Sequence, residues 1–345
     1  MLVHNSIESF SAWRKASGVA SGFVLTIGNF DGCHLGHQAL IKAARGLAGD
    51  VEGGDAEVCV LTFNPRPAVY FRKLNGLPSD EHAPASESLF DPRQKVEAMV
   101  ELDVNHLILQ VFDADFSRVT APDFFQAISR DGCVGIVVGD DFRFGSRRLG
   151  DAAFLAKACE TAEIAFRRVD PVSVHGVRAS SSTIRREILN SGNVDLASAL
   201  LGREYALDGE VERGRQNGRR IGIHTANLKA LDQIIPKNGV YAGYFALLGS
   251  EVDTTTRPPL LSRRESAMPC VINIGHRPTV DSSAMPRLTV EAHVIDFDFG
   301  EDALYGKRAR IYFSARLRDE MKFSSMEELK AQIHRDIETT RQITK

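Results

Sequence analysis

GNFDGCHLGH, residues 28–37, joins a hydrophobic stretch, GFVLTI (22–27), to a stretch with the character of a helix, QALIKAARGLA (38–48). The segment holds three glycines and, at its end, His34 and His37. Glycine lets the backbone take unusual dihedral angles and approach a ligand closely. The N-terminus of the following helix presents unpaired N–H groups and the positive end of the helix dipole, and the histidines add donors beside it. The stretch therefore predicts a phosphate site where a strand turns into a helix.

Two other interpretations of His34 and His37 stay open at this point. Paired histidines also bind zinc, and histidines also cap helices. A zinc site needs a third and a fourth ligand, and none is evident in the sequence. The strand before the segment, the glycines within it and the helix after it favour the phosphate site.

The composition is that of an ordinary globular protein. The chain has 345 residues, of which 43% are hydrophobic and 25% charged, and this length suffices for two or three domains. A net charge of −3 provides no basic field for nucleic acid, so we expect no nucleic-acid partner. The first residues lack a signal-peptide core, and the apolar runs are too short to span a bilayer, so we expect no membrane association. Five scattered cysteines without a C-x-x-C pair predict reduced thiols and a cytoplasmic protein. The oligomeric state stays open, a homo-oligomer included.

The first half alternates apolar stretches with helical ones. Val, Ile and Leu predominate in four candidate strands without strict alternation, as expected for parallel strands covered on both faces. The predicted strands are 22–28, 56–63, 105–112 and 133–139, and the predicted helices are 35–48, 92–101 and 121–130. This order predicts an α/β fold with a doubly wound parallel sheet, whose ligands bind at the carboxyl ends of the strands. We expect residues 70–92 to form a long loop.

The pattern changes after about residue 190. Short alternating segments separated by turn residues predict a small antiparallel β-barrel. They are 209–215, 239–247, 270–276, 288–297 and 307–317. A terminal amphipathic helix is expected to begin at Ser325, with Glu328 completing a capping box. Residues 249–268 have no periodicity and predict a polar insertion. These features divide the chain into residues 1–189 and 190–345.

Motifs along nearly the whole chain resemble those of bacterial bifunctional riboflavin kinase/FAD synthetases. In the first half they are TIGNFDGCHLGHQALI, LTFNPRP, VVGDDFRFG and SSSTIR; in the second half they include GEVERGRQNGRRIGIHTANL, INIGHRPTV, LTVEAHVIDFD and LRDEMKF. The resemblance implies that residues 1–189 form an FMN adenylyltransferase of the nucleotidyltransferase superfamily. It implies that residues 190–345 form a riboflavin kinase. The small-molecule partners are then riboflavin, FMN and ATP, and the final product is FAD.

The resemblance assigns roles to residues of the first half. His34 and His37 are implied to be catalytic, because they stabilise charge on phosphate as the FMN phosphate attacks the α-phosphate of ATP. ATP and phosphate contacts are implied for Gly28, Asn29, Asp31, Gly36, Ser181, Ser182 and Arg185. Taken alone, the serine run would more simply predict a helix N-cap.

The flavin side of the first half is implied to lie in GDDFRFG (139–145). Asp141, Phe142 and Phe144 are the implied contacts, although the phenylalanines fit a hydrophobic core equally well. Family members often carry an acidic residue and a histidine where this chain has Asn64 and Arg66, and Arg66 could meet a phosphate.

In the second half, a loop rich in glycine and arginine precedes the sequence TAN. By itself the loop fits a solvated turn as well as a nucleotide site. The resemblance implies that Gly214 and Arg219 contact ATP, and that Thr225 and Asn227 bind Mg²⁺ and ATP phosphates. His224 stands where the family has a proline, so we expect a looser loop there.

Glu291 is implied to be the catalytic base that accepts the proton of the riboflavin 5′-hydroxyl. Alternation with Val290 and Ala292 places its side chain on one face of a strand, where a lone glutamate is more often only solvent-facing. Arg318 and Phe323 are implied to lie near the flavin. Two further hypotheses stay open: one half is inactive, or the protein binds flavin without turnover.

Overall fold

The computed structural model of the chain describes residues 1–51, 54–76, 88–213, 225–230, 233–249, 267–277, 287–297 and 304–345. These residues form two compact units. The first contains the described residues up to 76 together with 94–179, and the second contains residues 88–93 and the described residues from 180 onward.

A six-stranded parallel sheet forms the centre of the first unit, in the order β1-β4-β3-β2-β5-β8. Its strands are β1 (Leu2–His4), β2 (Phe23–Ile27), β3 (Glu57–Asn64), β4 (His106–Val111), β5 (Cys133–Gly139) and β8 (Ala165–Val169). The four strands predicted from the sequence are β2 to β5, and each observed end agrees with the prediction within one residue. Two short ribbons pair β6 (Arg143–Phe144) with β7 (Gly150–Asp151) and β9 (Ser173–Val174) with β10 (Val177–Arg178).

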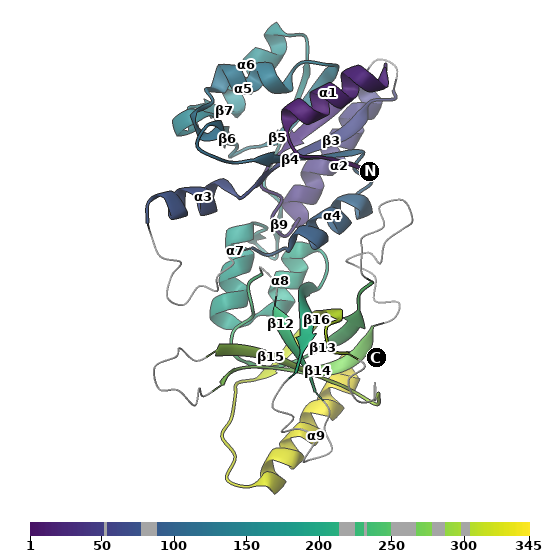
Figure 1. The fold of residues 1–345 in the computed structure, drawn as a ribbon, viewed down its shortest axis with the longest axis vertical. Coiled ribbons are helices and arrows are strands. Elements are labelled where there is room, and N and C mark those ends of the chain that lie inside the picture. The colour runs from purple at the N-terminus through teal and green to yellow at the C-terminus, as the bar shows by residue number, and fades with distance from the viewer. Residues whose placement is uncertain are drawn as a thin grey trace. The chain divides into compact units, whose positions relative to one another are not determined.

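Helices cover both faces of this sheet, which confirms the doubly wound fold (Figure 1). On one face α1 (Ile7–Ser17), α5 (Ala121–Ile128) and α6 (Ala152–Thr161) share a core with Phe23, Leu25 and Ile27 of β2. On the other face α2 (Leu35–Asp50) comes so close that a Cβ added at Gly135 would lie 2.8 Å from Leu47. Because side chains alternate along a buried strand, such a strand packs against a helical layer on both faces of the sheet.

The elements of the first unit that were not predicted include β1, α1, α6 and β8. The long loop predicted for residues 70–92 is wrong for residues 70–74, which belong to α3 (Pro67–Leu74). Pro67 stands in the first turn of α3, where its fixed φ suits a helix. The predicted helix 92–101 is confirmed as α4 (Pro92–Glu101). Residues 77–87 of the predicted loop lie outside the described residues.

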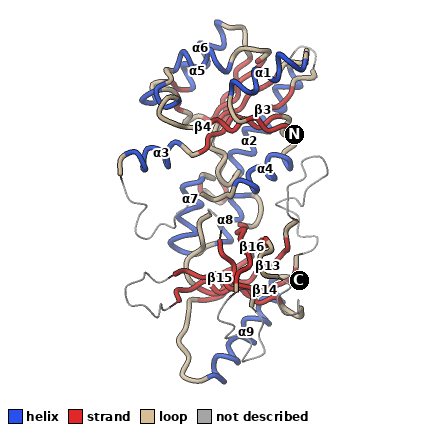
Figure 2. The backbone as a smooth tube through the Cα atoms, in the orientation of Figure 1, coloured by secondary structure: helices blue, strands red, loops and turns tan. Residues whose placement is uncertain are grey.

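The second unit contains the predicted antiparallel barrel (Figure 2). The closed barrel has the order β11-β12-β15-β14-β13-β16. Its strands are β11 (Tyr205–Glu212), β12 (Ala226–Ala230), β13 (Gly239–Leu247), β14 (Met268–Arg277), β15 (Arg287–Val294) and β16 (Arg308–Arg318). Three helical elements, α7 (Ser181–Arg186), η3 (Glu187–Ser191) and α8 (Val194–Leu201), precede it, and α9 (Met326–Ile343) packs against β13, β14 and β16.

The start of α9 confirms one half of the predicted cap and corrects the other. The Ser325 hydroxyl accepts a hydrogen bond from the Glu328 N–H at 3.1 Å. The Glu328 carboxylate, however, accepts from the N–H and hydroxyl of Ser324 at 2.9 and 2.8 Å, and not from the N-cap residue itself. These bonds stabilise the charged form and lower the pKa of Glu328.

A short segment from the middle of the first half belongs to the barrel unit. Leu89 and Phe90 are buried there, and Asp91 forms an ion pair with Arg308 at 2.9 Å. The buried Gln233 side chain donates to the Leu89 carbonyl at 3.1 Å and accepts from the Asp208 N–H at 2.9 Å. Residues 88–93 are therefore part of the barrel unit, although they precede it by about a hundred residues.

Asp208 and Arg310 form a fully buried ion pair on neighbouring strands of the barrel. Arg310 donates through Nε and a terminal nitrogen to the two carboxylate oxygens at 2.6 and 2.8 Å. Both side chains have 0% exposure, so each charge depends on the other for compensation.

A buried histidine pair connects β1 to β4 in the first unit. His4 Nε2 lies 3.1 Å from His106 Nδ1, and His106 Nε2 lies 3.2 Å from a Glu57 oxygen. The Trp13 ring lies beside both imidazoles. Burial, followed by repulsion from His106, lowers the pKa of His4 to about 4. Burial also lowers the pKa of His106, against the opposing effect of Glu57.

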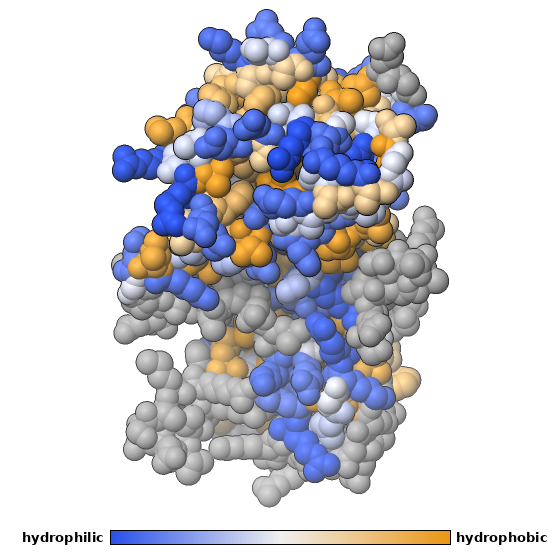
Figure 3. Space-filling view, turned by 45° about the horizontal axis from the view of Figure 1, so that its top comes forward, coloured by the Kyte–Doolittle hydropathy of each residue, from blue (hydrophilic) through white to orange (hydrophobic). Residues whose placement is uncertain are grey.

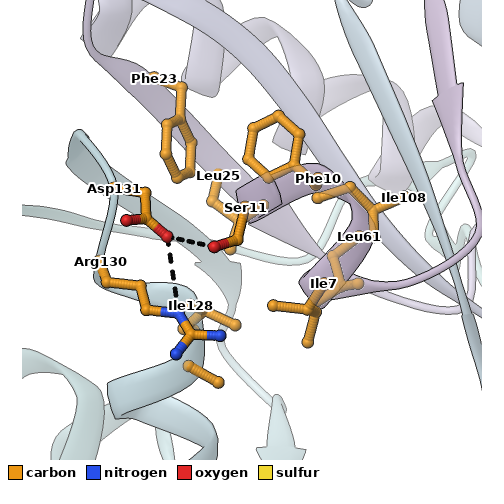
Figure 4. A pocket seen from close by; sticks show the side chains of 11 residues that line it. Ile7, Phe10, Ser11, Phe23, Leu25, Leu61, Ile108, Ile128, Arg130 and Asp131 are labelled. Atoms are coloured by element: carbon orange, nitrogen blue, oxygen red, sulfur yellow. Dashed lines mark hydrogen bonds and ion pairs between the residues drawn. The ribbon is translucent and has the colours of Figure 1, made fainter. Parts of the chain in front are cut away.

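Hydrophilic side chains cover much of the described surface visible in Figure 3, with apolar groups scattered among them. A small cavity lies between α1, α5 and the sheet (Figure 4), lined largely by apolar side chains such as Phe10 and Ile128. At its edge the Ser11 hydroxyl donates to Asp131 at 2.5 Å. Asp131 precedes β5, so this polar edge lies at the amino end of the sheet, away from the end where ligands of such sheets bind.

Replacement of one partner of the buried ion pair is expected to destabilise the barrel strongly. Asp208→Ala leaves Arg310 charged and buried, and we expect a loss of about 3–5 kcal/mol in the free energy of unfolding. Urea denaturation followed by near-ultraviolet circular dichroism measures this, since five of the six tyrosines lie at residue 205 or beyond. Asp319→Ala, which breaks an exposed ion pair with Arg316, is the control and should change stability little. Recovery of stability by Asp208→Leu together with Arg310→Met would support the explanation, and an unaffected Asp208→Ala protein would contradict it.

The first unit is expected to lose stability in mild acid. Because the folded state holds His4 neutral with a pKa near 4, the unfolded state takes up its proton first as pH falls below about 6.5. The free energy of unfolding should be unaffected by His4 above that pH. It should then decrease by up to about 1.4 kcal/mol per pH unit on the way to pH 4. Fluorescence of Trp13, the single tryptophan, reports unfolding of this unit. His4→Gln should reduce the slope, whereas replacement of the exposed His175 by Gln should leave it unchanged; equal slopes in all three proteins would refute the assignment.

Candidate functional site

The GNFDGCHLGH turn lies at the carboxyl end of β2, where the sheet reverses its winding. The chain passes from β2 to β3 and β4 on one side, and then crosses to β5 and β8 on the other side of β2. The strand order therefore reverses beside β2, and a crevice is expected at this point. His34 is the N-cap of α2, with φ −65° and ψ 171°, and makes no side-chain cap bond. The rings of His34 and His37 stack, with centroids 3.8 Å apart and planes 24° apart. Two imidazoles thus lie together at a helix N-terminus, the arrangement predicted for a phosphate site.

The backbone of this turn takes left-handed conformations at several residues. Phe30, Gly32 and Cys33 have φ values of 45°, 78° and 39°. Gly36 serves a different purpose, because a Cβ there would lie 3.1 Å from the His34 ring and 3.3 Å from the Ala179 carbonyl. Gly32 thus allows the backbone to bend, and Gly36 leaves room for the imidazole of His34.

Asp31 and Arg66 meet within the same site. Asp31 is 2% exposed, and one of its oxygens lies 3.1 Å from an Arg66 nitrogen. Arg66 is the N-cap residue of α3, which follows β3, so the ion pair joins the carboxyl ends of two neighbouring strands. The neighbouring Asn29 is exposed, and its carbonyl accepts a hydrogen bond from the Thr62 hydroxyl at 2.9 Å. Gly28 begins this turn and donates its N–H to the Leu61 carbonyl at 3.1 Å.

The three residues predicted for the flavin side differ in their surroundings. Asp141 is exposed and pairs with Arg178 at 2.6 Å. Phe142 is half-buried and stacks on Phe144, with centroids 5.5 Å apart. Phe144 is buried in the core and also contacts Phe124 and Phe154. Phe144 is therefore a core residue, the alternative that the sequence left open, while Phe142 remains accessible.

An aromatic cluster at the same end of the sheet was missed by the sequence analysis. It joins the ends of β3 and β4 to α3 and η1 (Phe116–Arg118), with centroid distances of 5.3 to 5.9 Å. Its members are Phe63, Tyr70, Phe71, Phe112 and Phe116. FNPRPAVYF (63–71) was the available signal, since two aromatic residues follow the β3 strand motif closely.

The serine motif lies at the start of the second unit. The N-cap of α7 is Ser180, whose hydroxyl accepts from the Thr183 N–H at 3.1 Å. Ser181 and Ser182 therefore stand in the first turn and Arg185 near its end. The helix predicted from this motif is confirmed, and its N-cap is the first serine of the run.

Glu291 and Asn227 stand directly opposite each other on adjacent barrel strands. Asn227 of β12 pairs with Glu291 of β15, which in turn pairs with Asn273 of β14. Val290 and Ala292 are 1% and 0% exposed and fill the barrel, so Glu291 lies on the outer face, as its alternation predicted. Side chains opposite each other in a sheet have Cβ atoms about 5 Å apart. Register thus brings a carboxylate and an amide together, and Thr225 immediately precedes β12. Gly214, Arg219 and His224 lie outside the described residues.

Arg318 and Phe323 lie where β16 leads into α9. Arg318 donates to both oxygens of Asp336 on α9, the shortest distance being 2.8 Å. Its guanidinium carbon lies 6.0 Å from the centre of the Phe323 ring. The structure therefore shows Arg318 fastening the terminal helix to the barrel.

Comparisons with known proteins agree with this geometry. The riboflavin kinase family model matches residues 201–344, and the FAD synthetase family model matches residues 17–183. The Escherichia coli K12 protein named bifunctional riboflavin kinase/FMN adenylyltransferase is 35% identical over 93% of this chain and 92% of its own length. The Haemophilus influenzae protein of the same name is 32% identical over 95% of this chain and 96% of its own length. The chain belongs to the bifunctional riboflavin kinase/FMN adenylyltransferase family.

A solved structure agrees over the same length. A Streptococcus pneumoniae crystal structure titled as a macrolide-efflux protein has 29% sequence identity and a TM-score of 0.77, covering 95% of this chain and 96% of its own. That protein and this chain, a member of the riboflavin kinase/FMN adenylyltransferase family, therefore share a fold. Among the residues that the structure describes, no helix has the length and apolarity required to cross a membrane.

The described residues show no set of three or more His, Cys, Asp or Glu side chains able to hold a metal ion. The side chains of Thr225, Asn227 and Glu291 offer oxygen atoms, and oxygen donors suit a hard cation rather than zinc.

Proposed function

We propose that the two reactions of this bifunctional enzyme are divided between the two halves of the chain. Residues 190–345 phosphorylate riboflavin to FMN with ATP, and residues 1–189 transfer AMP from a second ATP to FMN, which yields FAD and pyrophosphate. The observation that carries this division is that the two family models match separate halves, each with its own polar site. His34 and His37 stand in one half, and Asn227 and Glu291 in the other.

In the adenylyl transfer, a phosphate oxygen of FMN attacks the α-phosphorus of ATP and the bond to the leaving pyrophosphate breaks. The nucleophile is already an anion, so the step needs charge stabilisation and orientation more than a base. His34 and His37 donate hydrogen bonds to the phosphate oxygens beside the positive end of α2. Asn29 and Gly36 line the same turn, and Ser181, Ser182 and Arg185 hold the triphosphate.

The flavin ring of FMN needs an apolar surface near these phosphates. The accessible Phe142 and the aromatic cluster around Phe112 lie at the carboxyl end of the same sheet. Aromatic faces stack on a planar heterocycle. We assign the isoalloxazine ring to this region, with Asp141 at its polar edge.

In the kinase reaction, Glu291 accepts the proton of the riboflavin 5′-hydroxyl as the oxygen attacks the γ-phosphorus and ADP leaves. The opposite residue, Asn227, and the adjacent Thr225 supply uncharged oxygen donors. These donors fit Mg²⁺, which neutralises charge on the phosphate oxygens when it is bound. Gly214 and Arg219 contact the nucleotide, and Phe323 contacts the flavin.

A cytoplasmic setting is part of this proposal. The five cysteines are free and buried, and burial raises the pKa of the Cys133 thiol to about 12. Such thiols are suited to a reducing compartment.

Substitutions in the two sites are expected to separate the two activities. Glu291→Gln should lower FMN formation from riboflavin by about 10²–10⁴-fold, because the hydroxyl loses its base, and should leave conversion of FMN to FAD unchanged. His37→Asn should do the reverse. Chromatography of flavins after incubation with ATP and Mg²⁺ measures both reactions. Glu210→Gln and His175→Asn, at exposed positions, are the matched controls. Loss of both activities in either site variant would contradict the division, and flavin binding without ATP consumption by the wild type would show a carrier.

Removal of Mg²⁺ is expected to stop both reactions, since both act on polyphosphates whose charge the ion neutralises. Flavin chromatography with excess chelator, followed by added Mg²⁺, tests this. Asn227→Ala should raise the Mg²⁺ concentration required for half-maximal FMN formation and leave that for FAD formation unchanged. A shift in both requirements would place Asn227 outside the kinase metal site.

A further inference from the structure

Lys95 reaches into the turn that carries the histidines. It lies on α4, and its ammonium nitrogen is 3.3 Å from the Asn29 carbonyl oxygen and 3.5 Å from the Thr62 hydroxyl oxygen. The Thr62 hydroxyl donates to the same carbonyl at 2.9 Å. One carbonyl at the end of β2 is thus held by donors from β3 and α4.

This carbonyl controls the start of the turn. Because the peptide unit is planar, fixing the Asn29 carbonyl also fixes the N–H of Phe30, the first residue with a positive φ. Left-handed conformations at Phe30 and Cys33 cost about 1 kcal/mol or more each and persist only where the surroundings hold them. The directions of His34 and His37 follow from these residues, since α2 begins directly after them.

The charges around Lys95 add a second effect. With Lys95 protonated, the side chains of Asp31, Arg66 and Lys95 together carry a net charge of +1. Burial lowers the pKa of the Lys95 ammonium below its ordinary value, and Arg66 lowers it further, while Asp31 and the Cys33 thiol oppose the shift. While it is protonated, this half-buried lysine beside Arg66 favours the approach of a polyphosphate.

We propose that Lys95 is a positioning residue for adenylyl transfer, which anchors the Asn29 carbonyl and thereby orients His34 and His37 toward the phosphates. This inference rests on the proposed adenylyl transfer in residues 1–189. It assigns a role to a side chain that stands outside the motifs on which that function was proposed.

The experiment compares Lys95→Met, Lys95→Arg and the control Lys42→Met in the full chain, Lys42 being an exposed residue of α2. Rates of FMN-to-FAD conversion are measured against ATP concentration and pH, and riboflavin phosphorylation is measured in the same samples. Lys95→Met should lower kcat for FAD formation about 10–100-fold, with a smaller change in KM for ATP and no change in FMN formation. Lys42→Met should behave as the wild type.

Lys95→Arg tests whether the charge of Lys95 matters, through the pH dependence of FAD formation. A merely structural role of the side chain would leave that pH dependence unchanged. Wild-type FAD formation should fall at alkaline pH as Lys95 loses its proton, and Lys95→Arg should retain activity to higher pH because guanidinium stays charged. Wild-type kcat in Lys95→Met would overturn the proposal. An unchanged fall of activity at alkaline pH in Lys95→Arg would also overturn it. This second test remains valid even if Trp13 fluorescence shows that Lys95→Met does not fold. Absence of FAD formation by the wild type itself would instead overturn the proposed adenylyl transfer.

Discussion

The bend between β2 and α2 is the constraint on which the phosphate chemistry that we propose for the first unit depends. A parallel strand leads into a helix within a few residues, so the backbone must turn sharply through left-handed conformations at Phe30, Gly32 and Cys33. Only after that bend can α2 point its N-terminus at the carboxyl end of the sheet. The ion pair of Asp31 with Arg66 and the bond from Thr62 to the Asn29 carbonyl tie the bend to the neighbouring strand β3. The site is therefore held by the sheet as much as by its own sequence.

Strand register has the corresponding importance in the barrel. A shift of β15 by one residue would turn Glu291 into the interior and expose Val290 and Ala292. The apolar residues inside the barrel thus fix which face carries the carboxylate, and pairing with β12 places Asn227 opposite it. The segment 88–93 covers another part of this unit with Leu89 and Phe90. The barrel unit therefore includes more than one continuous stretch of chain.

The sequence was sufficient for features that depend on local pattern. The strands β2 to β5, the helices α2, α4 and α5, the barrel and the Ser325 cap follow from hydrophobic periodicity and residues near in sequence. It was insufficient where a side chain meets a distant partner. The residues around Arg318 do not predict its ion pair with Asp336, and those around Asp31 do not predict its ion pair with Arg66. The burial of Phe144 likewise depends on Phe124 and Phe154. β1 was missed because three residues carry too little pattern, although pairing with β4 makes the strand stable.

The two sites that we propose differ in a way that follows from the nucleophile assigned to each. A phosphate monoester is already charged, so the site that activates it gains little from a base and much from donors that share the negative charge of the transition state. Imidazoles at a helix N-terminus meet that need. A primary hydroxyl is neutral and must lose a proton as it attacks, so its site needs a carboxylate within reach, with uncharged oxygen donors beside it for the cation. In the reactions that we propose, the two histidines of the first unit meet the first need, and the glutamate opposite an asparagine in the barrel meets the second.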